Sequence, residues 1–373
     1  MPGAILQLAS YGAQDIYLTG NPQVTFFKTV YRRYTSFALE SILLTQNYNV
    51  KMGSSFTFDI DRQGDLLSSI FFHIQLDNSS IIQTYLGFSL IDTIELKIGN
   101  QTIDKQYGEW MAIWCDLTHS YSKGQMLDDM TSNSADTIIV PLQFWFCRNT
   151  GLAIPLIALQ YHQIQLIVKF RKSSEVIGNP EITDFKIYAD YIFLDTDERR
   201  RYSQLSHEYL IEQVQLSESA PISIYETRAV VDVEFSHPVK ELMWIIYDVS
   251  GSIYNPLHSE RAEKVLIQMN NQDRLSERTG LYFTRQQRYQ HHTGSGAFSG
   301  YPNIHIYSFA LRPEEHQPTG TCNFSRIDNT TMAITFNGTA MANGTEYRLI
   351  RVYAVSYNVL RIMNGLGGIV YST

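Results

Sequence analysis

The chain has 373 residues, enough for two domains that each bury a core of their own. Charged residues make up 18% and aromatic residues 13% of the sequence, which excludes a disordered chain and favours β-rich packing with large protein interfaces. The formal charge of -8 argues against direct nucleic-acid binding, which needs a clustered basic surface. Two basic clusters are interpreted as solvated or ion-paired side chains: Lys28, Arg32 and Arg33, and Arg199, Arg200 and Arg201.

The first 24 residues mix Gly, Ala and Gln with isolated apolar positions and do not alternate cleanly. They predict an N-terminal arm over 1–24 rather than a core strand. This segment lacks the basic region and long apolar core of a signal peptide, and the sequence contains no apolar window long enough to span a bilayer. We therefore expect a chain that is neither secreted by the usual route nor inserted into a membrane.

Gly108–Ser120 is predicted to form a helix that pads a β-sandwich. Its apolar residues recur at helical spacing: Trp110, Ile113, Trp114 and Leu117. A cofactor-stacking role for the two tryptophans is the weaker alternative.

The run Val140–Phe170 is predicted to form two strands joined by a loop that Gly and Pro mark. Apolar and polar or less apolar residues alternate first over Leu142–Cys147 and again over Gln163–Lys169, which is typical of strands that bury one face.

Asp195–Gln213 has an acidic start and no Gly or Pro, and Leu205, Tyr209 and Ile211 suggest a helical face. The segment predicts a helix capped by Asp195 or Thr196. We assign 198–213 as a helical connector.

The sequence repeats itself weakly on either side of this connector, in a constant order. Three segments of the first half resemble three of the second: Asp65–Ile74 and Lys240–Val249, Ile94–Met111 and Lys264–Phe283, and Phe185–Leu194 and Tyr347–Leu360. The offset has the size of one eight-stranded sandwich with its loops. The sequence therefore predicts an all-β fold of two related sandwiches, over 25–197 and 214–373.

The sequence contains no recognisable catalytic or metal-binding pattern. Cys115, Cys147 and Cys322 lie far apart without CxxC spacing, which indicates neither a disulfide framework nor a zinc site and fits a reducing cytosol. A cupin-like metal site needs two histidines one residue apart on a strand. His291 and His292 are adjacent and would point to opposite faces of a strand, and the remaining candidates lack the pair: His305, Glu314, Glu315 and His316. We predict no catalytic residue, no metal and no cofactor.

Six Asn-x-Ser/Thr triplets are possible glycosylation sites, at Asn78, Asn100, Asn323, Asn329, Asn337 and Asn343. Without a signal peptide, turn formation by Asn and Gly is the favoured account of this spelling. Surface glycans on the outer loops remain the alternative.

Together with Val140–Phe170, six blocks closely resemble, in order, the major capsid proteins of the iridovirus, phycodnavirus and mimivirus group of large DNA viruses. The first reads YGAQDIYLTGNPQVTFFKTVYRR. The blocks are Tyr11–Arg33, Leu90–Met111, Tyr191–Gln213, Phe235–Trp244, Tyr307–Asp328 and Arg351–Gly368. The resemblance implies a double jelly roll with short connecting helices, and a structural rather than an enzymatic protein.

The resemblance also implies a homotrimeric, pseudo-hexagonal capsomer in the icosahedral virion shell, assembled in the host cytoplasm. Expected partners are other copies of the chain, neighbouring capsomers, and penton and minor capsid proteins. The arm residues expected to make contacts at the capsomer base are Gln14, Asp15, Ile16, Tyr17 and Leu18. The chain is shorter than usual members of this family, and Leu76–Gly87 and Val249–Pro256 look like trimmed loops. A minor capsid paralogue, a transient scaffold and a jelly-roll lectin are the alternatives.

Overall fold

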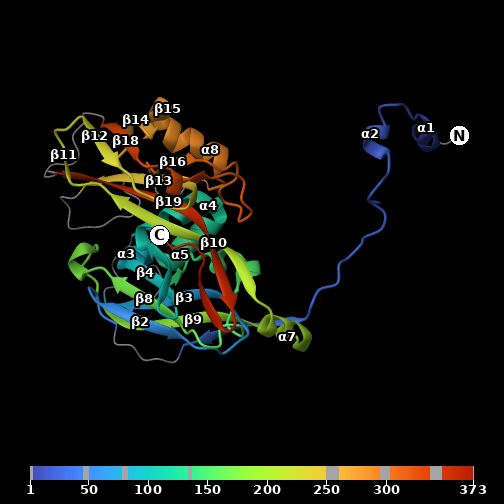
Figure 1. Cartoon of the computed structure of the whole chain (residues 1–373), viewed down its shortest axis with the longest axis horizontal. Helices are drawn as coiled ribbons and strands as arrows, with labels where there is room; N and C mark the ends of the chain where they lie inside the picture. Colours follow the sequence, from blue (N-terminus) through green and yellow to red (C-terminus); the bar gives the residue numbers. More distant parts are fainter. Residues whose placement is uncertain are drawn as a thin grey trace. The chain divides into compact units, whose positions relative to one another are not determined.

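A computed structural model describes residues 3–44, 50–77, 83–132, 137–248, 260–294, 303–336 and 347–372 (Figure 1). The chain divides into two units, 1–36 and 37–373. The first unit contains two short helices, α1 (Gly3–Ala9) and α2 (Ile16–Thr19), and buries no residue of either. Among the described residues no helix is both long and apolar enough to cross a membrane.

The second unit begins with a sandwich of two antiparallel sheets. One sheet has the order β1 (Phe37–Leu43), β9 (Ile182–Leu194), β3 (Leu66–Leu76) and β6 (Ile138–Pro141), with β7 (Ile154–Pro155) also paired to β3. The other has the order β2 (Ser55–Ile60), β8 (Ile164–Phe170), β4 (Ile91–Ile98) and β5 (Gln101–Tyr107). The alternating residues of both sheets meet in one core, where the ring of Phe185 lies 5.3 Å from that of Phe58 and 5.2 Å from that of Phe72.

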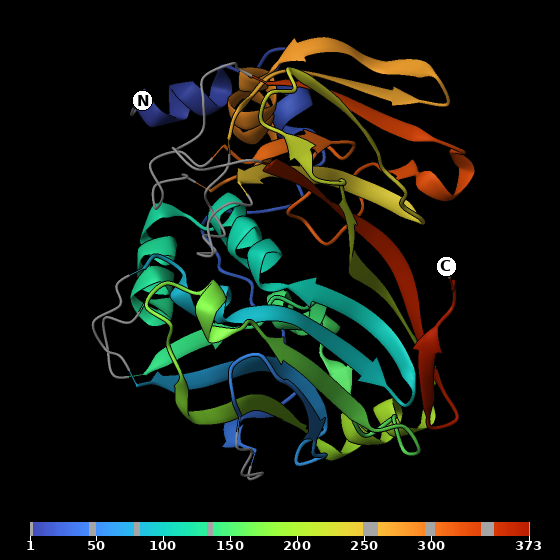
Figure 2. The ribbon, with the colours of Figure 1, turned by 90° about the vertical axis from the view of Figure 1, so that its left-hand side faces the viewer.

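A second sandwich follows with the same strand order. Its first sheet is β10 (His207–Glu218), β19 (Tyr347–Met363), β13 (Pro238–Asp248) and β16 (His305–Ser308), extended by β11 (Ile222–Ser223), β17 (Cys322–Asn323) and β20 (Leu366–Ile369). Its other sheet is β12 (Arg228–Asp232), β18 (Thr330–Phe336), β14 (Ala262–Met269) and β15 (Gln272–Thr279). Each strand of the first sandwich thus has a counterpart in the second, which confirms the predicted internal repeat and the double jelly roll. Figure 2 shows the two sandwiches one above the other.

The two copies share details that strand order alone does not require. Pairing of β3 with β9 shifts register after Leu67, and pairing of β13 with β19 shifts after Val239. A bulge therefore lies at the same point of both sheets. It aligns β9 with β19 so that KIYA of the first copy, ending at Ala189, coincides with RVYA of the second, ending at Ala354.

A glycine ends the hairpin of each copy for the same steric reason. A Cβ on Gly108 would lie 2.3 Å from the carbonyl oxygen of Ile91, and one on Gly280 would lie 1.9 Å from that of Ala262. Since both neighbours are backbone atoms at the start of the first strand of the hairpin, β4 or β14, only glycine fits where the chain turns from strand into helix.

Short helices connect or cover the strands. They are α3 (Leu86–Leu90), α4 (Gly108–Thr118), α5 (Tyr121–Thr131), α6 (Trp145–Arg148), α7 (Thr196–Gln204) and α8 (Gln287–His291), with a π-helical turn at Tyr282–Gln286. The helix predicted over Gly108–Ser120 is confirmed as α4, and its first ten residues are buried. The counterpart of α4 in the second sandwich is the segment Tyr282–His291, which follows β15 as α4 follows β5.

The strand predicted over Leu142–Cys147 is wrong. Strand β6 ends at Pro141, and Trp145–Arg148 forms the helical turn α6. Every residue of Leu142–Phe146 is buried. Because all sides of this run are buried, the alternation of residue types did not indicate a strand with one buried and one exposed face.

The helix predicted to extend to Gln213 is also wrong over its second half. Helix α7 ends at Gln204 and β10 begins at His207, so residues 207–213 belong to the first strand of the second sandwich rather than to a helical connector. The spacing of Tyr209 and Ile211 fits a strand, and pairing with β19 overrides the helical propensity of the segment.

Candidate functional site

The junction between the two sandwiches is where the second unit concentrates buried charge. The outer face of the sheet containing β19 and β13 packs on the first sandwich, and Met243, Ile245 and Val355 are buried in the core that the two share. Figure 2 shows β19 running from the second sandwich down beside the first. This sheet is therefore buried on both faces.

Glu212 of β10 is the centre of the junction. One carboxylate oxygen lies 2.9 Å from the guanidinium of Arg148 and the other lies 2.7 Å from the ammonium of Lys240, which is fully buried. Burial acts to raise the pKa of Glu212, but Lys240 and Arg148 outweigh it and the pKa lies below its ordinary value. Lys240 also lies 5.2 Å from the ring centre of Trp114 on α4, a favourable cation–π distance.

Two more ion pairs cross the junction from α4. Glu109 accepts hydrogen bonds from the guanidinium of Arg351 at 2.9 Å and from the hydroxyl of Tyr353 at 2.6 Å. The carboxylate and the carbonyl of Asp116 accept from Arg288, at 2.8 and 2.7 Å. These pairs join α4 of the first sandwich to β19 and α8 of the second.

His292 forms a buried bridge next to them. Its Nε2 lies 3.1 Å from Glu241 and its Nδ1 lies 3.1 Å from Glu314. Burial disfavours the charged ring, but the two carboxylates prevail and raise the pKa of His292 to about 9. The residues after His292 add two hydrogen bonds. Thr293 N donates to Glu314, and Gly294 N donates to the carbonyl of Leu117 at 2.7 Å, which links this segment to the first sandwich.

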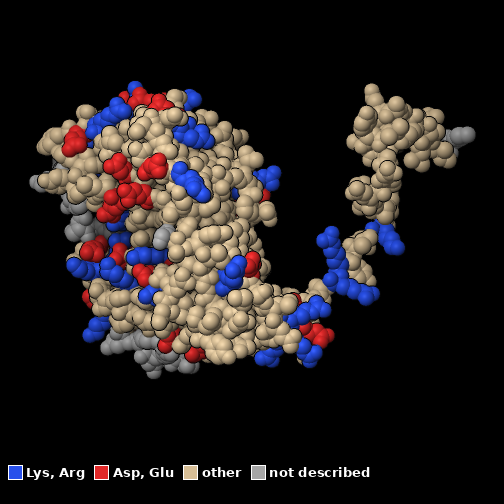
Figure 3. Space-filling view, in the orientation of Figure 1, with Lys and Arg blue, Asp and Glu red and all other residues tan. Residues whose placement is uncertain are grey.

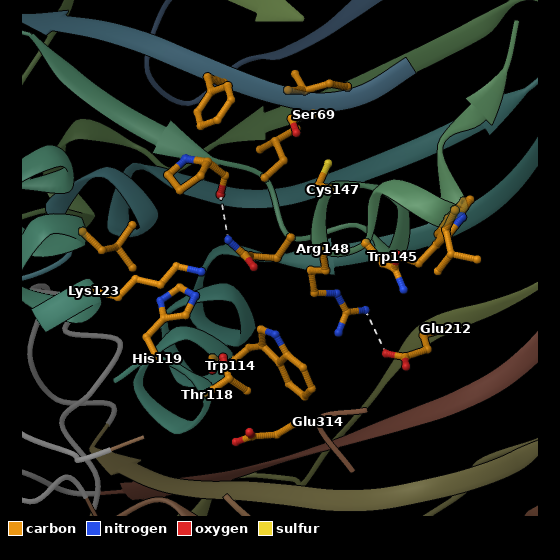
Figure 4. A pocket seen from close by; sticks show the side chains of 18 of the residues that line it. Ser69, Trp114, Thr118, His119, Lys123, Trp145, Cys147, Arg148, Glu212 and Glu314 are labelled. Atoms are coloured by element: carbon orange, nitrogen blue, oxygen red, sulfur yellow. Dashed lines mark hydrogen bonds and ion pairs between the residues drawn. The ribbon is translucent and has the colours of Figure 1, made fainter. Parts of the chain in front are cut away.

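A cavity of about 600 Å³ opens beside this network (Figure 4). Its walls combine aromatic, cationic and acidic side chains: Ser69, Phe71, Trp114, His119, Lys123, Trp145, Arg148, Glu212, Glu314 and His316. In Figure 4 the ion pair of Arg148 and Glu212 lies on one wall. Across the described ranges, no three His, Cys, Asp or Glu side chains gather as a metal site would require. The arrangement joins the two sandwiches through buried ion pairs.

Comparison with known proteins agrees with this architecture. The family model described as the N-terminus of the major capsid protein matches residues 25–195, and that of the large eukaryotic DNA virus major capsid protein matches residues 198–368. The chain belongs to this major capsid protein family. It is 41% identical to the major capsid protein of Pyramimonas orientalis virus and 38% identical to that of Paramecium bursaria Chlorella virus 1, with all of each chain covered.

Solved structures show the same fold. The chain resembles the capsid protein in the PBCV-1 capsid with a TM-score of 0.77 and 33% identity, over 94% of this chain and 100% of that one. The Faustovirus major capsid protein gives a TM-score of 0.73 at 12% identity, with 96% of both chains covered, and this likeness shows the fold alone. This capsid protein is thus a structural component of a virion.

The arm residues that the sequence singles out lie in the first unit. Gln14 and Asp15 precede α2, which contains Ile16, Tyr17 and Leu18. Tyr17 is 91% exposed and Leu18 is 87% exposed. More large apolar side chains of this unit are exposed: Ile5, Leu6, Leu8, Tyr11, Val24, Phe26, Phe27, Val30, Tyr31 and Tyr34. The unit reaches Ser36, twelve residues beyond the predicted arm of 24.

Three of the six candidate glycosylation sites are exposed in the described chain. Asn100 is in the β4–β5 turn, the side chain of Asn323 accepts from Ser325 N, and Asn329 donates to Asn271. Two of these side chains thus make hydrogen bonds within the fold, and glycosylation of any of them stays a prediction. Asn78, Asn337 and Asn343 lie outside the described residues, as does the predicted loop Val249–Pro256.

The histidines considered for metal binding serve separate structural roles. His291 and His292 are at the end of α8 rather than on a strand, which corrects the prediction because their neighbours continue from a π-helical turn. His305 is fully buried, accepts from Ala262 N at 3.1 Å and stacks on Trp244, and burial lowers its pKa to about 3. His316 lies 3.9 Å from Glu212.

The basic clusters are on the surface of the molecule. Arg199 pairs with Asp65 at 2.9 Å, and Arg200 and Arg201 are exposed. On the face drawn in Figure 3, acidic and basic side chains of the second unit are interspersed. This distribution fits the solvated or ion-paired interpretation.

Sequence reasoning missed the junction network. The sequence does contain a sign of this network, because Lys240 and Glu241 interrupt the apolar strand PVKELMWII and Glu212 interrupts YLIEQVQL. A charge within a buried strand needs a partner of opposite sign. The partner could not be assigned from one sequence, since Arg148 is on another domain.

Proposed function

We propose that three copies of this chain form a pseudo-hexagonal capsomer that tiles the facets of an icosahedral virion. The observation that carries the proposal is the duplication: two sandwiches with one strand order, fixed side by side by buried ion pairs. Three such chains around a threefold axis present six similar sandwiches, so one gene product can occupy a nearly hexagonal outline. Family membership supports the same assembly.

Native mass spectrometry and light scattering on the purified chain test this function. A stable particle of three chains near neutral pH is the expected result. A monodisperse monomer at micromolar concentration would contradict it. Copy number in purified virions separates a major capsid protein from a minor paralogue or a transient scaffold, because only the major protein should be the most abundant shell component.

We propose further that the exposed apolar side chains of the first unit bind neighbouring capsomers or minor capsid proteins, with pentons completing the vertices. Cytoplasmic assembly belongs to this proposal, since three thiols without disulfides suit a reducing compartment.

The work of the protein is proposed to be mechanical rather than enzymatic. The buried titratable groups at the junction are held in ion pairs, which leaves them without the access to solvent or substrate that catalysis requires. Elemental analysis of the native protein is the direct test. One equivalent of iron, zinc or manganese per chain, lost on replacement of His291, His292, His305 and His316 by Ala, would overturn this assignment.

A further inference from the structure

The carboxylates in the wall of the cavity beside the junction are already neutralised by partners in the chain. Glu212 pairs with Lys240 and with Arg148. Glu314 shares His292 with Glu241, and the raised pKa of His292, about 9, keeps that ring protonated at neutral pH. The network thus holds as many cations as carboxylates: Lys240, Arg148 and His292 against Glu212, Glu241 and Glu314. It leaves no excess negative charge in the wall to repel an anion.

Lys123 is a cation of the wall without such a partner. It lies on α5, its side chain is exposed, and among the described residues no carboxylate forms an ion pair with its ammonium. The neighbouring His119 is neutral, because burial and the charge of Lys123 lower its pKa to about 4. The described wall therefore carries one uncompensated positive charge beside an uncharged imidazole.

Three buried nitrogen atoms of cavity-lining residues lack a hydrogen-bond partner in the described chain. They are Nδ1 of His119, Nε1 of Trp145 and Nε of Arg148. The last two can only donate, and the neutral imidazole donates from Nδ1 in one of its two tautomers. A buried donor without an acceptor is costly, and native proteins satisfy nearly all such groups. The partner that suits all three nitrogen atoms is an oxygen acceptor.

These groups face one space from different elements. In Figure 4, Lys123 and His119 point toward the middle of the cavity from one side, and Arg148 lies across from them. Lys123 belongs to α5, whereas Trp145 and Arg148 belong to α6. Donors from separate helices therefore surround a volume of about 600 Å³, which is within the range of small-molecule sites.

The remaining wall is apolar and adaptable. Phe71 and Trp114 supply aromatic surface, and Met126 and Met130 of α5 supply flexible thioether side chains. Met126 is 68% exposed although it lines the cavity. Methionine side chains adjust to ligands of different shape. The wall therefore suits an apolar body next to a charged head group.

We propose that this cavity binds an organic anion with an apolar body, either a carboxylate or a phosphate monoester. The anionic head lies at Lys123 and His119, and the apolar body lies against Trp114 and the methionines of α5. Because residues of the second sandwich complete the wall, among them Glu212 and Glu314, the ligand contacts both sandwiches of one chain. Binding should stabilise the junction, since only the folded chain has the site. The site forms within one chain, so it does not depend on the proposed capsomer.

A matched pair of fluorescent probes tests the charge requirement. Anilinonaphthalene sulfonate is an anion and phenylnaphthylamine is neutral, while both share one aromatic body and fluoresce more strongly in apolar surroundings. The sulfonate stands in for the carboxylate or phosphate. In the full chain at neutral pH, Lys123→Glu should weaken binding of the anion about tenfold and leave the neutral probe unchanged. The matched control Lys51→Glu replaces an exposed lysine outside the cavity and should bind both probes as the native chain does.

Two further variants locate the bound probe. His119→Leu removes the buried nitrogen and keeps an apolar side chain of similar size, so the fold should be at least as stable while the anion binds about tenfold more weakly. Ser69→Trp places a large ring in the cavity and should block both probes. The signal that remains in Ser69→Trp measures probe bound elsewhere, such as on the exposed arm. Circular dichroism and urea unfolding establish that each variant is folded.

Competition distinguishes the two kinds of head group. Decanoate and decyl phosphate carry the same alkyl chain, and decanol is their neutral control. Displacement of the sulfonate probe by decanoate alone assigns a carboxylate ligand, and displacement by decyl phosphate alone assigns a phosphate ester. The anion that displaces the probe should also raise the melting temperature of the native chain but not that of Lys123→Glu.

Two results would overturn the site. Equal binding of the sulfonate probe to the native chain, Lys123→Glu and His119→Leu would show that the cavity does not select a negative charge. Equal displacement by decanol and by the two anions would show an apolar space that needs no head group. A native chain that is monomeric yet binds the anion as described would contradict the capsomer and support this site.

Discussion

Replacing Glu212 by Gln should destabilise the second unit far more than replacing either of its cationic partners. The substitution keeps the shape of the side chain but leaves Lys240 as a fully buried, uncompensated ammonium beside the guanidinium of Arg148. Breaking a buried pair in this way costs about 3–5 kcal/mol of unfolding free energy. Lys240→Met should cost only about 1 kcal/mol, because Glu212 retains Arg148 and the thioether packs against the ring of Trp114.

Urea unfolding at pH 7 measures these free energies, followed by the fluorescence of the four tryptophans at one fixed protein concentration. Glu208→Gln is the matched control, since its pair with Arg361 is exposed and should contribute at most about 1 kcal/mol. The double variant Glu212→Gln with Lys240→Met should recover more than about 1 kcal/mol relative to Glu212→Gln. A Glu212→Gln variant as stable as Glu208→Gln would refute the view that the junction is held by a compensated buried charge.

Three further predictions follow from local geometry. The pKa of His292 is raised from 6.5 to about 9 in the folded chain, so its ion-paired bridge should stabilise the fold fully below about pH 6.5. This stabilisation should be lost as pH rises toward 9, and the melting temperature should therefore fall across this window in the native chain but not in His292→Gln. Gly280→Ala should cost about 2–4 kcal/mol in urea unfolding, because its Cβ would lie 1.9 Å from a backbone oxygen, and an unchanged midpoint would contradict the role of this glycine. Deleting residues 1–24 should leave a folded trimer but lower its incorporation into shells, because no residue of the two helices in this segment is buried. Loss of folding would show that the segment is a core element.

The duplicated fold was predictable from sequence where one periodicity dominated. Alternation along Ile164–Phe170 has one buried and one less buried side, and this strand formed as expected. The helix predicted over Gly108–Ser120 also formed, although its first ten residues are all buried, because its large apolar residues recur at helical spacing. Alternation failed at Leu142–Cys147, where Phe144, Trp145 and Phe146 are all buried. Prediction also failed after Gln204, because pairing with β19 decides the structure of 207–213 and a single sequence does not reveal that partner.

Candidate sites were harder to predict for a related reason. The arm and the Asn-x-Ser/Thr triplets are local features that can be read along the sequence, and what they bind or carry stays a prediction. The junction depends on contacts between distant parts of the chain, such as Glu109 with Arg351. Only an assembled fold brings these charges together, so the sequence shows that a partner is needed but not which one.

The divergence of the two copies separates a permanent contact from a reversible one. At the junction within the chain, Val214 and Val355 seal the outer face of the second sandwich. At the position of Val355 the first sandwich has Asp190, which is polar and only partly covered, so less apolar area is available there to bury between copies. Contacts between chains should therefore be weaker than the junction, and weaker contacts allow misplaced subunits to leave during assembly.

Salt should distinguish the two kinds of contact. Charged side chains in contacts between copies would lie near solvent, where raising the salt concentration from about 0.05 M to about 0.5 M screens their attraction. The buried pair of Glu212 and Lys240 is shielded from this screening. We expect the trimer to dissociate at a higher protein concentration in high salt, while the urea midpoint of dissociated chains changes little. Equal sensitivity of both transitions to salt would show that the two contacts do not differ in kind.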